Sequence, residues 1–161
     1  MRGYASEEIF DASELELYAL ACGFVEAVPY EIDGEAVRCH ELVRAVVAAL
    51  PPRFSGVRIC DGYYGMVEHS WIWTRPPALD KTAARGWIEP PNILDVYAPG
   101  RVPLVELVAV SVALPCEYRR GDSRKDLKRS VIARLTQLML GKQQPCVCPE
   151  PWIRHEKDCV A

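Results

Sequence analysis

The 161-residue sequence lacks the features that mark several large classes of protein. It contains no uninterrupted apolar run of about 18 residues, the length expected of a membrane-spanning helix. Its N-terminus carries Glu7, Glu8 and Asp11 where an export signal would have a basic and then an apolar segment. We therefore expect a cytoplasmic protein that does not enter a membrane.

The charge balance and the glycine pattern argue against further classes. The formal net charge is -3, from 19 basic and 22 acidic side chains, so no global field draws the molecule to nucleic acid. Gly62 and Gly65 alone form neither a phosphate-binding loop nor a dinucleotide-binding fingerprint. We expect no nucleic-acid partner.

Length, apolar content and cysteine number indicate one domain without disulfides. An apolar fraction of 50% at this length is enough for one substantial core. We expect a single α+β domain over residues 1–141 and a tail containing cysteine and proline over 142–161. The seven cysteines are odd in number and spread along the chain, so we expect thiols or metal ligands before disulfides.

The tail contains one group of residues suited to a metal. Cys146 and Cys148 are followed by His155 and Cys159. Three thiolates and one imidazole make a ligand set for tetrahedral zinc, although the Cys-x-Cys spacing matches no common zinc finger. The tail therefore holds either a structural zinc ion or free thiols.

Hydrophobic periodicity predicts three main helices. They are expected to cover residues 13–23, 35–50 and 124–140. Ser13 should cap the first helix and Gly23 should end it, while Asp122 or Ser123 should cap the third and Gly141 end it. The packing stripe of the third helix is predicted to consist of Leu127, Val131, Leu135 and Leu138.

The second helix should end before Pro51-Pro52 and bury one apolar stripe. That stripe is predicted to consist of Cys39, Leu42, Val43, Val46, Val47 and Leu50. Arg38, Glu41 and Arg44 should lie away from the stripe. Cys39 should therefore face inward near the N-terminal end of the helix.

Runs of β-forming residues predict a small, mainly antiparallel sheet packed against the helices. The expected strands are residues 57–60, 66–74, 92–97 and 102–114. The last is so continuously apolar that we expect it to be buried on both faces, with Glu106 as an exception. In the second, His69 should share a face with Trp71 and Trp73, and Asp95 lies on the next strand.

Cys39, His69 and Asp95 could together make a catalytic site. A thiol nucleophile needs a base, a group that orients the base, and an environment that favours thiolate, such as a helix N-terminus. Trp71 and Trp73 would then line a substrate cleft. Taken singly, each of these residues could equally be part of the core. Cys60 is a weaker nucleophile candidate because a strand gives it no helix dipole.

The same residues carry a resemblance to a family. The segments 39–42, 57–63, 68–73 and 93–96, read as CHEL, VRICDGY, EHSWIW and ILDV, resemble the core of the transglutaminase-like group of papain-like cysteine enzymes. That group places a catalytic Cys at a helix start, a His-x-Trp strand after it and an Asp on the next strand. The resemblance implies a papain-like core in which Cys39 is the nucleophile, His69 the base and then the acid, and Asp95 the orienting carboxylate.

The resemblance also implies the chemistry. It is attack on an amide or ester of a protein or peptide substrate through an acyl-thioester, with no cofactor required. Amide or isopeptide hydrolysis, glutamine deamidation and transfer to an amine would all use the same residues. Papain-like proteases have a glutamine shortly before the cysteine, whereas this chain has Asp33-Gly34-Glu35. Backbone amides around Cys39, or a residue from elsewhere in the chain, should therefore bind the oxyanion.

The alternative is a non-catalytic protein-binding module with the same fold. It would be stabilised by zinc in its tail, and it would engage a protein partner through the basic segment 119–134 or the loop 74–91.

Overall fold

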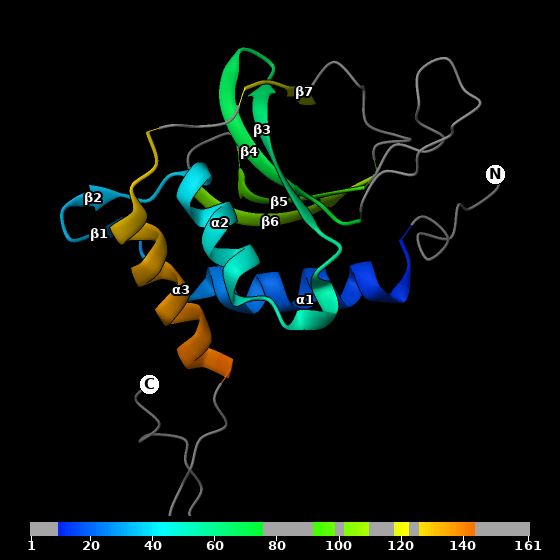
Figure 1. The fold of residues 1–161 in the computed structure, drawn as a ribbon, viewed down its shortest axis with the longest axis horizontal. Coiled ribbons are helices and arrows are strands. Elements are labelled where there is room, and N and C mark those ends of the chain that lie inside the picture. The colour runs from blue at the N-terminus through cyan, green and yellow to red at the C-terminus, as the bar shows by residue number, and fades with distance from the viewer. Residues whose placement is uncertain (1–9, 76–91, 99–101, 110–117, 123–125, 144–161) are drawn as a thin grey trace, which may run out of the picture.

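Five antiparallel strands form the sheet on which the helices pack (Figure 1). The computed structural model describes residues 10–75, 92–98, 102–109, 118–122 and 126–143. The strands of the sheet are β3 (Arg58–Tyr64), β4 (Val67–Trp73), β5 (Ile93–Ala98), β6 (Val102–Val108) and β7 (Tyr118–Arg120). Their spatial order is β6-β5-β4-β3-β7. The α+β class and the antiparallel sheet predicted from the sequence are confirmed.

Three helices and a small hairpin complete the described fold. They are α1 (Ala12–Glu26), β1 (Glu31–Ile32), β2 (Glu35–Ala36), α2 (Cys39–Ala49) and α3 (Arg129–Gln143), with a short 3-10 turn at Pro52–Phe54. Helix α1 contacts β5 and β6, α2 contacts β3, β4 and β5, and α3 packs on α1 and α2. Among these helices we find none with both the length and the apolar character that crossing a bilayer demands.

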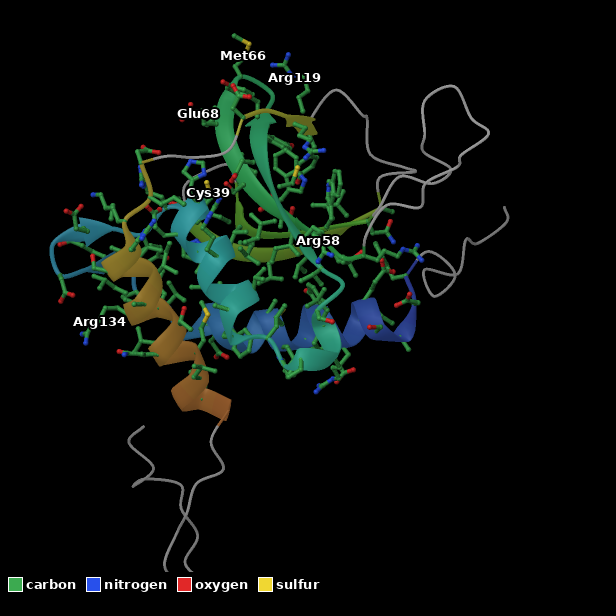
Figure 2. The ribbon with its side chains drawn as sticks, viewed as in Figure 1. Cys39, Arg58, Met66, Glu68, Arg119 and Arg134 are labelled. Carbon is green, nitrogen blue, oxygen red and sulfur yellow. The ribbon has the colours of Figure 1, made fainter. Side chains whose placement is uncertain are left out.

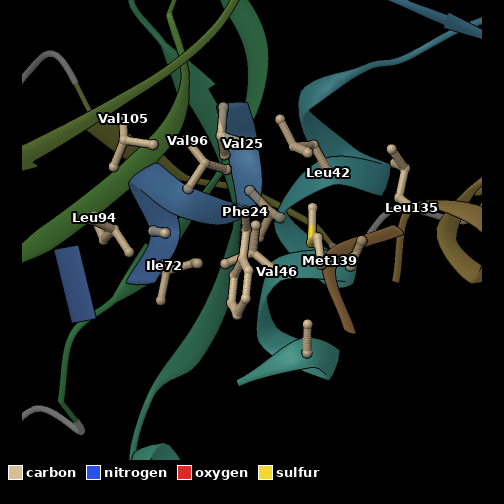
Figure 3. Close-up of a cluster of buried hydrophobic side chains, with 14 of the residues drawn as sticks. Phe24, Val25, Leu42, Val46, Ile72, Leu94, Val96, Val105, Leu135 and Met139 are labelled. Carbon is tan, nitrogen blue, oxygen red and sulfur yellow. The ribbon is translucent and has the colours of Figure 1, made fainter. Parts of the chain in front are cut away.

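One core joins these elements (Figure 3). Its side chains include Phe24 and Val25 from α1, Leu42 and Val46 from α2, Ile72 from β4, Leu94 and Val96 from β5, and Leu135 and Met139 from α3. A second, smaller cluster contains Cys60, Trp71 and Ile93. Because successive residues of a strand face opposite sides, β4 and β5 contribute to both clusters.

Helix α1 differs from the prediction at both ends. Asp11, rather than Ser13, caps it, since its carboxylate accepts a hydrogen bond from the Glu14 amide and Glu14 returns one to the Asp11 amide. The helix continues through Gly23 to Glu26. Burial of its apolar face in the core outweighs the low helix propensity of one glycine.

Helix α2 begins four residues later than predicted. Asp33 and Gly34 have φ values of 52° and 80°, which place them in the turn of the β1–β2 hairpin. The chain then enters the helix at Cys39, with Arg38 in an extended conformation as its N-cap. The predicted stop is confirmed, because the helix ends at Ala49, before the two prolines.

Helix α3 and strand β6 also depart from the prediction. Helix α3 begins at Arg129 instead of 124, and it continues through Gly141 to Gln143. Its buried stripe is Val131, Leu135 and Met139, whereas Leu138 is exposed. The prediction of burial on both faces is wrong for the described part of this strand: β6 (Val102–Val108) lies at the edge of the described sheet, and Leu104 is 47% exposed. Glu106, predicted as the exception, is exposed, and residues 110–114 of the predicted strand lie outside the described residues. Burial there follows the alternation of a strand covered on one face.

Candidate active site

Cys39 is the first residue of α2, at the helix end beside the β3–β4 hairpin, whose tip carries Met66 (Figure 2). The Leu42 amide donates to the Arg38 carbonyl and closes the first helical turn around it. The side chain is only 6% exposed. The amides of a first helical turn lack acceptors within the helix, and together with the helix dipole they favour a negative charge. Cys39 therefore lies where a thiolate is stabilised.

His69 and Asp95 meet between β4 and β5. The backbone pairing of these strands comprises Ile72 with Leu94 and Trp73 with Ile93. Beyond it, His69 Nε2 lies 2.7 Å from Asp95 Oδ2. The two side chains are 4% and 2% exposed. The structure thus brings together the histidine and the carboxylate that the sequence analysis paired.

Two further donors hold the Asp95 carboxylate. The Tyr118 hydroxyl donates to Oδ2 over 2.9 Å, and the Tyr97 amide donates to Oδ1 over 3.2 Å. An ionised carboxylate can only accept hydrogen bonds, so His69 Nε2 donates to it as these two groups do. The Nδ1 atom is then the nitrogen of His69 available to a reacting group.

Aromatic rings surround the His69–Asp95 pair. The Tyr118 ring packs edge-on against Tyr64, with centroids 5.0 Å apart, and against Trp71, at 5.2 Å. Trp71 stacks on His69 at 6.2 Å. These contacts restrict rotation of the His69 imidazole and exclude water from the Asp95 carboxylate. The exclusion of water strengthens the electrostatic interaction between the two side chains.

The pKa values of Cys39 and His69 move in opposite directions. Burial raises the pKa of Cys39, but hydrogen-bonding and charge interactions with His40 and His69 outweigh it and lower the pKa to about 6. Burial lowers the pKa of His69, but its interactions with Asp95 and Cys39 outweigh this and raise the pKa to about 9. Between these values the pair is a thiolate and an imidazolium.

Cys60, the weaker nucleophile candidate, lies in a different environment. It belongs to the small cluster with Trp71 and Ile93. Burial raises its pKa to about 11. It is therefore a neutral thiol near pH 7, and neutral thiols are poor nucleophiles.

A polar network next to Cys39 was missed by the sequence analysis. His40 Nδ1 lies 2.7 Å from Ser70 Oγ, and the Ser70 hydroxyl donates to Asp61 over 2.5 Å. Arg44, which was predicted to lie away from the packed face, donates twice to the Asp61 carboxylate. Two signals in the sequence could have indicated this network. His40 and Arg44 are four residues apart on one helix, and Ser70 follows His69 and so points to the other face of the same strand.

Glu41 was also placed wrongly by the helical periodicity. It is 1% exposed and forms an ion pair with Arg38. It also accepts a hydrogen bond from the Lys128 amide, just before α3. Burial of this carboxylate fixes the first turn of α2, and with it Cys39, against the start of α3.

The two tryptophans proposed for a substrate cleft differ. Trp71 is fully buried against His69, and its indole Nε1 has no hydrogen-bond partner in the described part of the chain. Trp73 is half-buried, and the guanidinium of Arg120 lies over its ring, 5.8 Å from the centroid. Only Trp73 thus presents part of its ring to solvent.

The proposed zinc ligands Cys146, Cys148, His155 and Cys159 lie outside the described residues. Within the described ranges, no group of three or more His, Cys, Asp or Glu side chains could hold a metal ion.

Comparisons with protein-family models, with curated proteins and with solved structures each found no match.

Proposed function

We propose that this protein is a cysteine-dependent acyl-transfer enzyme in which Cys39 is the nucleophile, His69 the base and acid, and Asp95 the orienting carboxylate. One observation supports this above all others: His69 Nε2 lies 2.7 Å from a carboxylate, while the same imidazole interacts with a thiol at a helix start. Nucleophile, base and orienting group in this arrangement define thiol-dependent acyl transfer.

The reaction begins from the thiolate and imidazolium. Cys39 Sγ attacks the substrate carbonyl carbon and forms a carbon–sulfur bond. The carbon–nitrogen bond of an amide then breaks as the leaving amine takes a proton from His69, which leaves an acyl-thioester. A water molecule gives a proton to His69 and attacks the thioester. The carbon–sulfur bond breaks, and thiolate and imidazolium are restored.

The first turn of α2 supplies the oxyanion donors in this proposal. Asp33 and Glu35, which stand where papain-like proteases have their glutamine, are solvent-exposed, in the turn and second strand of the hairpin, and interact with Arg134 and Lys128. Free amides at a helix start can donate hydrogen bonds to the negative charge that develops on the carbonyl oxygen of the substrate. The core is of papain-like or transglutaminase-like type, and the substrate is an amide of a protein or peptide. Water as acceptor gives hydrolysis or deamidation, and an amine gives transfer.

Thiol labelling tests the proposal without a known substrate. Iodoacetamide at pH 7, with the modified cysteine identified by peptide mass spectrometry, should modify Cys39 before Cys60 because only the thiolate reacts quickly. An activated ester of a short peptide should be hydrolysed by the wild type and by Cys60→Ala, but not by Cys39→Ala. Ester turnover that survives in Cys39→Ala would overturn the proposal.

The burial of Cys39, His69 and Asp95 favours a second function, a non-catalytic protein-binding module. Exposures of 6%, 4% and 2% are ordinary for core residues. For this function, all thiols should label equally slowly and no ester should be turned over. The part of this hypothesis that concerns zinc is tested by metal analysis of the purified protein against a Cys146→Ser/Cys148→Ser variant.

A further inference from the structure

Two imidazoles, not one, lie beside Cys39 Sγ. His69 comes from β4 and is paired with Asp95. His40 follows Cys39 in the first turn of α2, is buried, and has its Nδ1 atom 3.7 Å from Cys39 Sγ. A single base is enough for the acyl transfer proposed above, so the second imidazole needs an explanation of its own.

The network behind His40 determines which of its atoms carries a proton. Arg44 donates to both oxygens of Asp61, over 3.2 and 2.7 Å, which is the two-point contact of a guanidinium with a carboxylate. Ser70 gives its only hydroxyl proton to Asp61 Oδ1. The Ser70 oxygen can then only accept at His40 Nδ1, so Nδ1 carries a hydrogen.

This chain of donors is rigidly held. Asp61 and Ser70 are directly opposite each other in the β3–β4 ladder. Arg44 also donates to the His40 carbonyl over 3.0 Å, one helical turn away. The backbone of both elements thus fixes the imidazole, and the His40 ring cannot present a bare Nδ1 to its neighbours without breaking a buried hydrogen bond.

We propose that His40 is a second catalytic imidazole of this site, whose one Nδ1 hydrogen is shared between Ser70 Oγ at 2.7 Å and Cys39 Sγ at 3.7 Å, with its tautomer set by Ser70, Asp61 and Arg44. This inference rests on the acyl-transfer function proposed above. The two histidines divide the work: His69 exchanges protons, and His40 stabilises sulfur as the thiolate and as the departing group of the thioester.

The charged and titratable groups around Cys39 come from four elements. His69 faces it from β4 with Asp95 of β5 behind it, and His40 belongs to its own helix with Asp61 of β3 and Arg44 of α2 behind it. Removal of the His40 donor should therefore leave the His69–Asp95 pair in place and still raise the pKa of the thiol.

Two substitutions of His40 separate a donor from a merely space-filling side chain. Asn carries its amide nitrogen at the position of histidine Nδ1, whereas Leu fills a similar volume without a donor. In His40→Leu the pKa of Cys39 should rise by about one unit, so the rate of its alkylation by iodoacetamide at pH 6 should fall about fivefold or more. In His40→Asn the rate should fall much less. Unchanged labelling in His40→Leu would overturn the proposal, as would equal loss in both variants.

Nitrogen-15 NMR of the wild-type imidazoles gives a second measurement that needs no substitution. Long-range spectra near pH 7 should show a hydrogen on His40 Nδ1. A bare Nδ1 on His40 would overturn the proposal even where the variants fold poorly. Both measurements probe the Cys39 thiol and the His40 imidazole and need no substrate. If the wild-type protein did not hydrolyse the ester, that result would contradict the acyl-transfer function and leave the His40 hydrogen bond to be judged by these two measurements.

Discussion

The side chains of His69 and Asp95 join β4 and β5 beyond the last backbone pair of these strands, Ile72 with Leu94. His69 is paired with Gly62 of β3 and Asp95 with Glu106 of β6, but the described β4–β5 ladder does not reach either residue. The Nε2–Oδ2 contact of 2.7 Å therefore links the two residues across β4 and β5. Both side chains are buried and ionisable, so the reactivity of Cys39 should depend closely on this contact.

The pH dependence of turnover should be bell-shaped. The thiolate of Cys39 is present above a lowered pKa of about 6, and the imidazolium of His69 is present below a raised pKa of about 9. The rate constant kcat/KM for a peptide ester should therefore rise through pH 6 and fall through pH 9. A profile with a single rise near the pKa of an ordinary thiol, about 8.5, would contradict the ion pair.

Asp95→Asn should lower the rate of turnover and move the alkaline limb of the pH profile to lower pH. The carboxylate is a cause of the raised pKa of His69, so its loss should move that limb from about 9 toward lower pH. Loss of the orienting charge should reduce kcat by about 10²- to 10⁴-fold, as in other triads. Asp33→Asn, in the exposed hairpin turn, is the matched control and should leave the profile unchanged. An unmoved alkaline limb in Asp95→Asn would show that this carboxylate does not set the His69 pKa.

Tyr118→Phe should move the alkaline limb in the opposite direction. Its hydroxyl shares the negative charge of Asp95 Oδ2, so without it more of that charge acts on His69. We expect a somewhat higher His69 pKa and a loss of about 1 kcal/mol in the free energy of unfolding. Urea unfolding and the pH profile measure the two effects, with Tyr30→Phe on an exposed tyrosine as the control. A downward shift of the limb would contradict this role.

Gly62→Ala should disturb the β3–β7 pairing. A Cβ atom at Gly62 would lie 1.9 Å from the Arg119 carbonyl oxygen, so the backbone of β7 would have to move. We expect a loss of about 3 kcal/mol in the free energy of unfolding, and a shift of the alkaline limb like that of Tyr118→Phe, because Tyr118 lies on the same strand. Gly23→Ala is the control: it has open space inside α1 and should stabilise the protein by about 0.5–1 kcal/mol. Equal effects of the two substitutions on stability would contradict the close approach.

Glu14→Ala should destabilise the fold without touching the site. Glu14 Oε1 accepts hydrogen bonds from Thr74 and Asn92, and all three residues are buried. Its removal takes a buried acceptor away from the Thr74 hydroxyl and the Asn92 amide and breaks the Asp11–Glu14 capping box, at a cost of about 2–4 kcal/mol in the free energy of unfolding. Glu16→Ala, on the exposed side of α1, should change that free energy by less than about 0.5 kcal/mol. Thermal unfolding of both variants checks the difference, and similar melting temperatures would contradict it.

Local pattern was enough to predict part of the site. The two-residue period of a strand placed His69 and Trp71 on one face and Ser70 and Ile72 on the other. In the structure Trp71 and Ile72 belong to separate clusters, and His69 stacks on Trp71. The helical period placed Cys39 on the buried stripe. These features depend on neighbours in sequence, which a periodic pattern records.

Burial caused by distant partners could not be predicted in this way. Glu41 resembles a solvent-facing residue of a first helical turn, yet it is buried because the Lys128 amide, 87 residues away, bonds to it. The helix predicted from residue 35 starts late because residues 35 and 36 pair with residues 31 and 32 in a short hairpin, which the helical periodicity did not show. The His40 network needs β3, β4 and α2 together, so no single element could indicate it.

The contacts at Thr74 and Asn92 define a junction. The Thr74 amide and hydroxyl both donate to the Asn92 carbonyl, and Glu14 binds both side chains. The chain therefore leaves the core and returns to it at one closed point. Because one carboxylate holds the end of β4 and the start of β5 together, breaking its bonds should release both strand ends in one step, as a single unit of local unfolding.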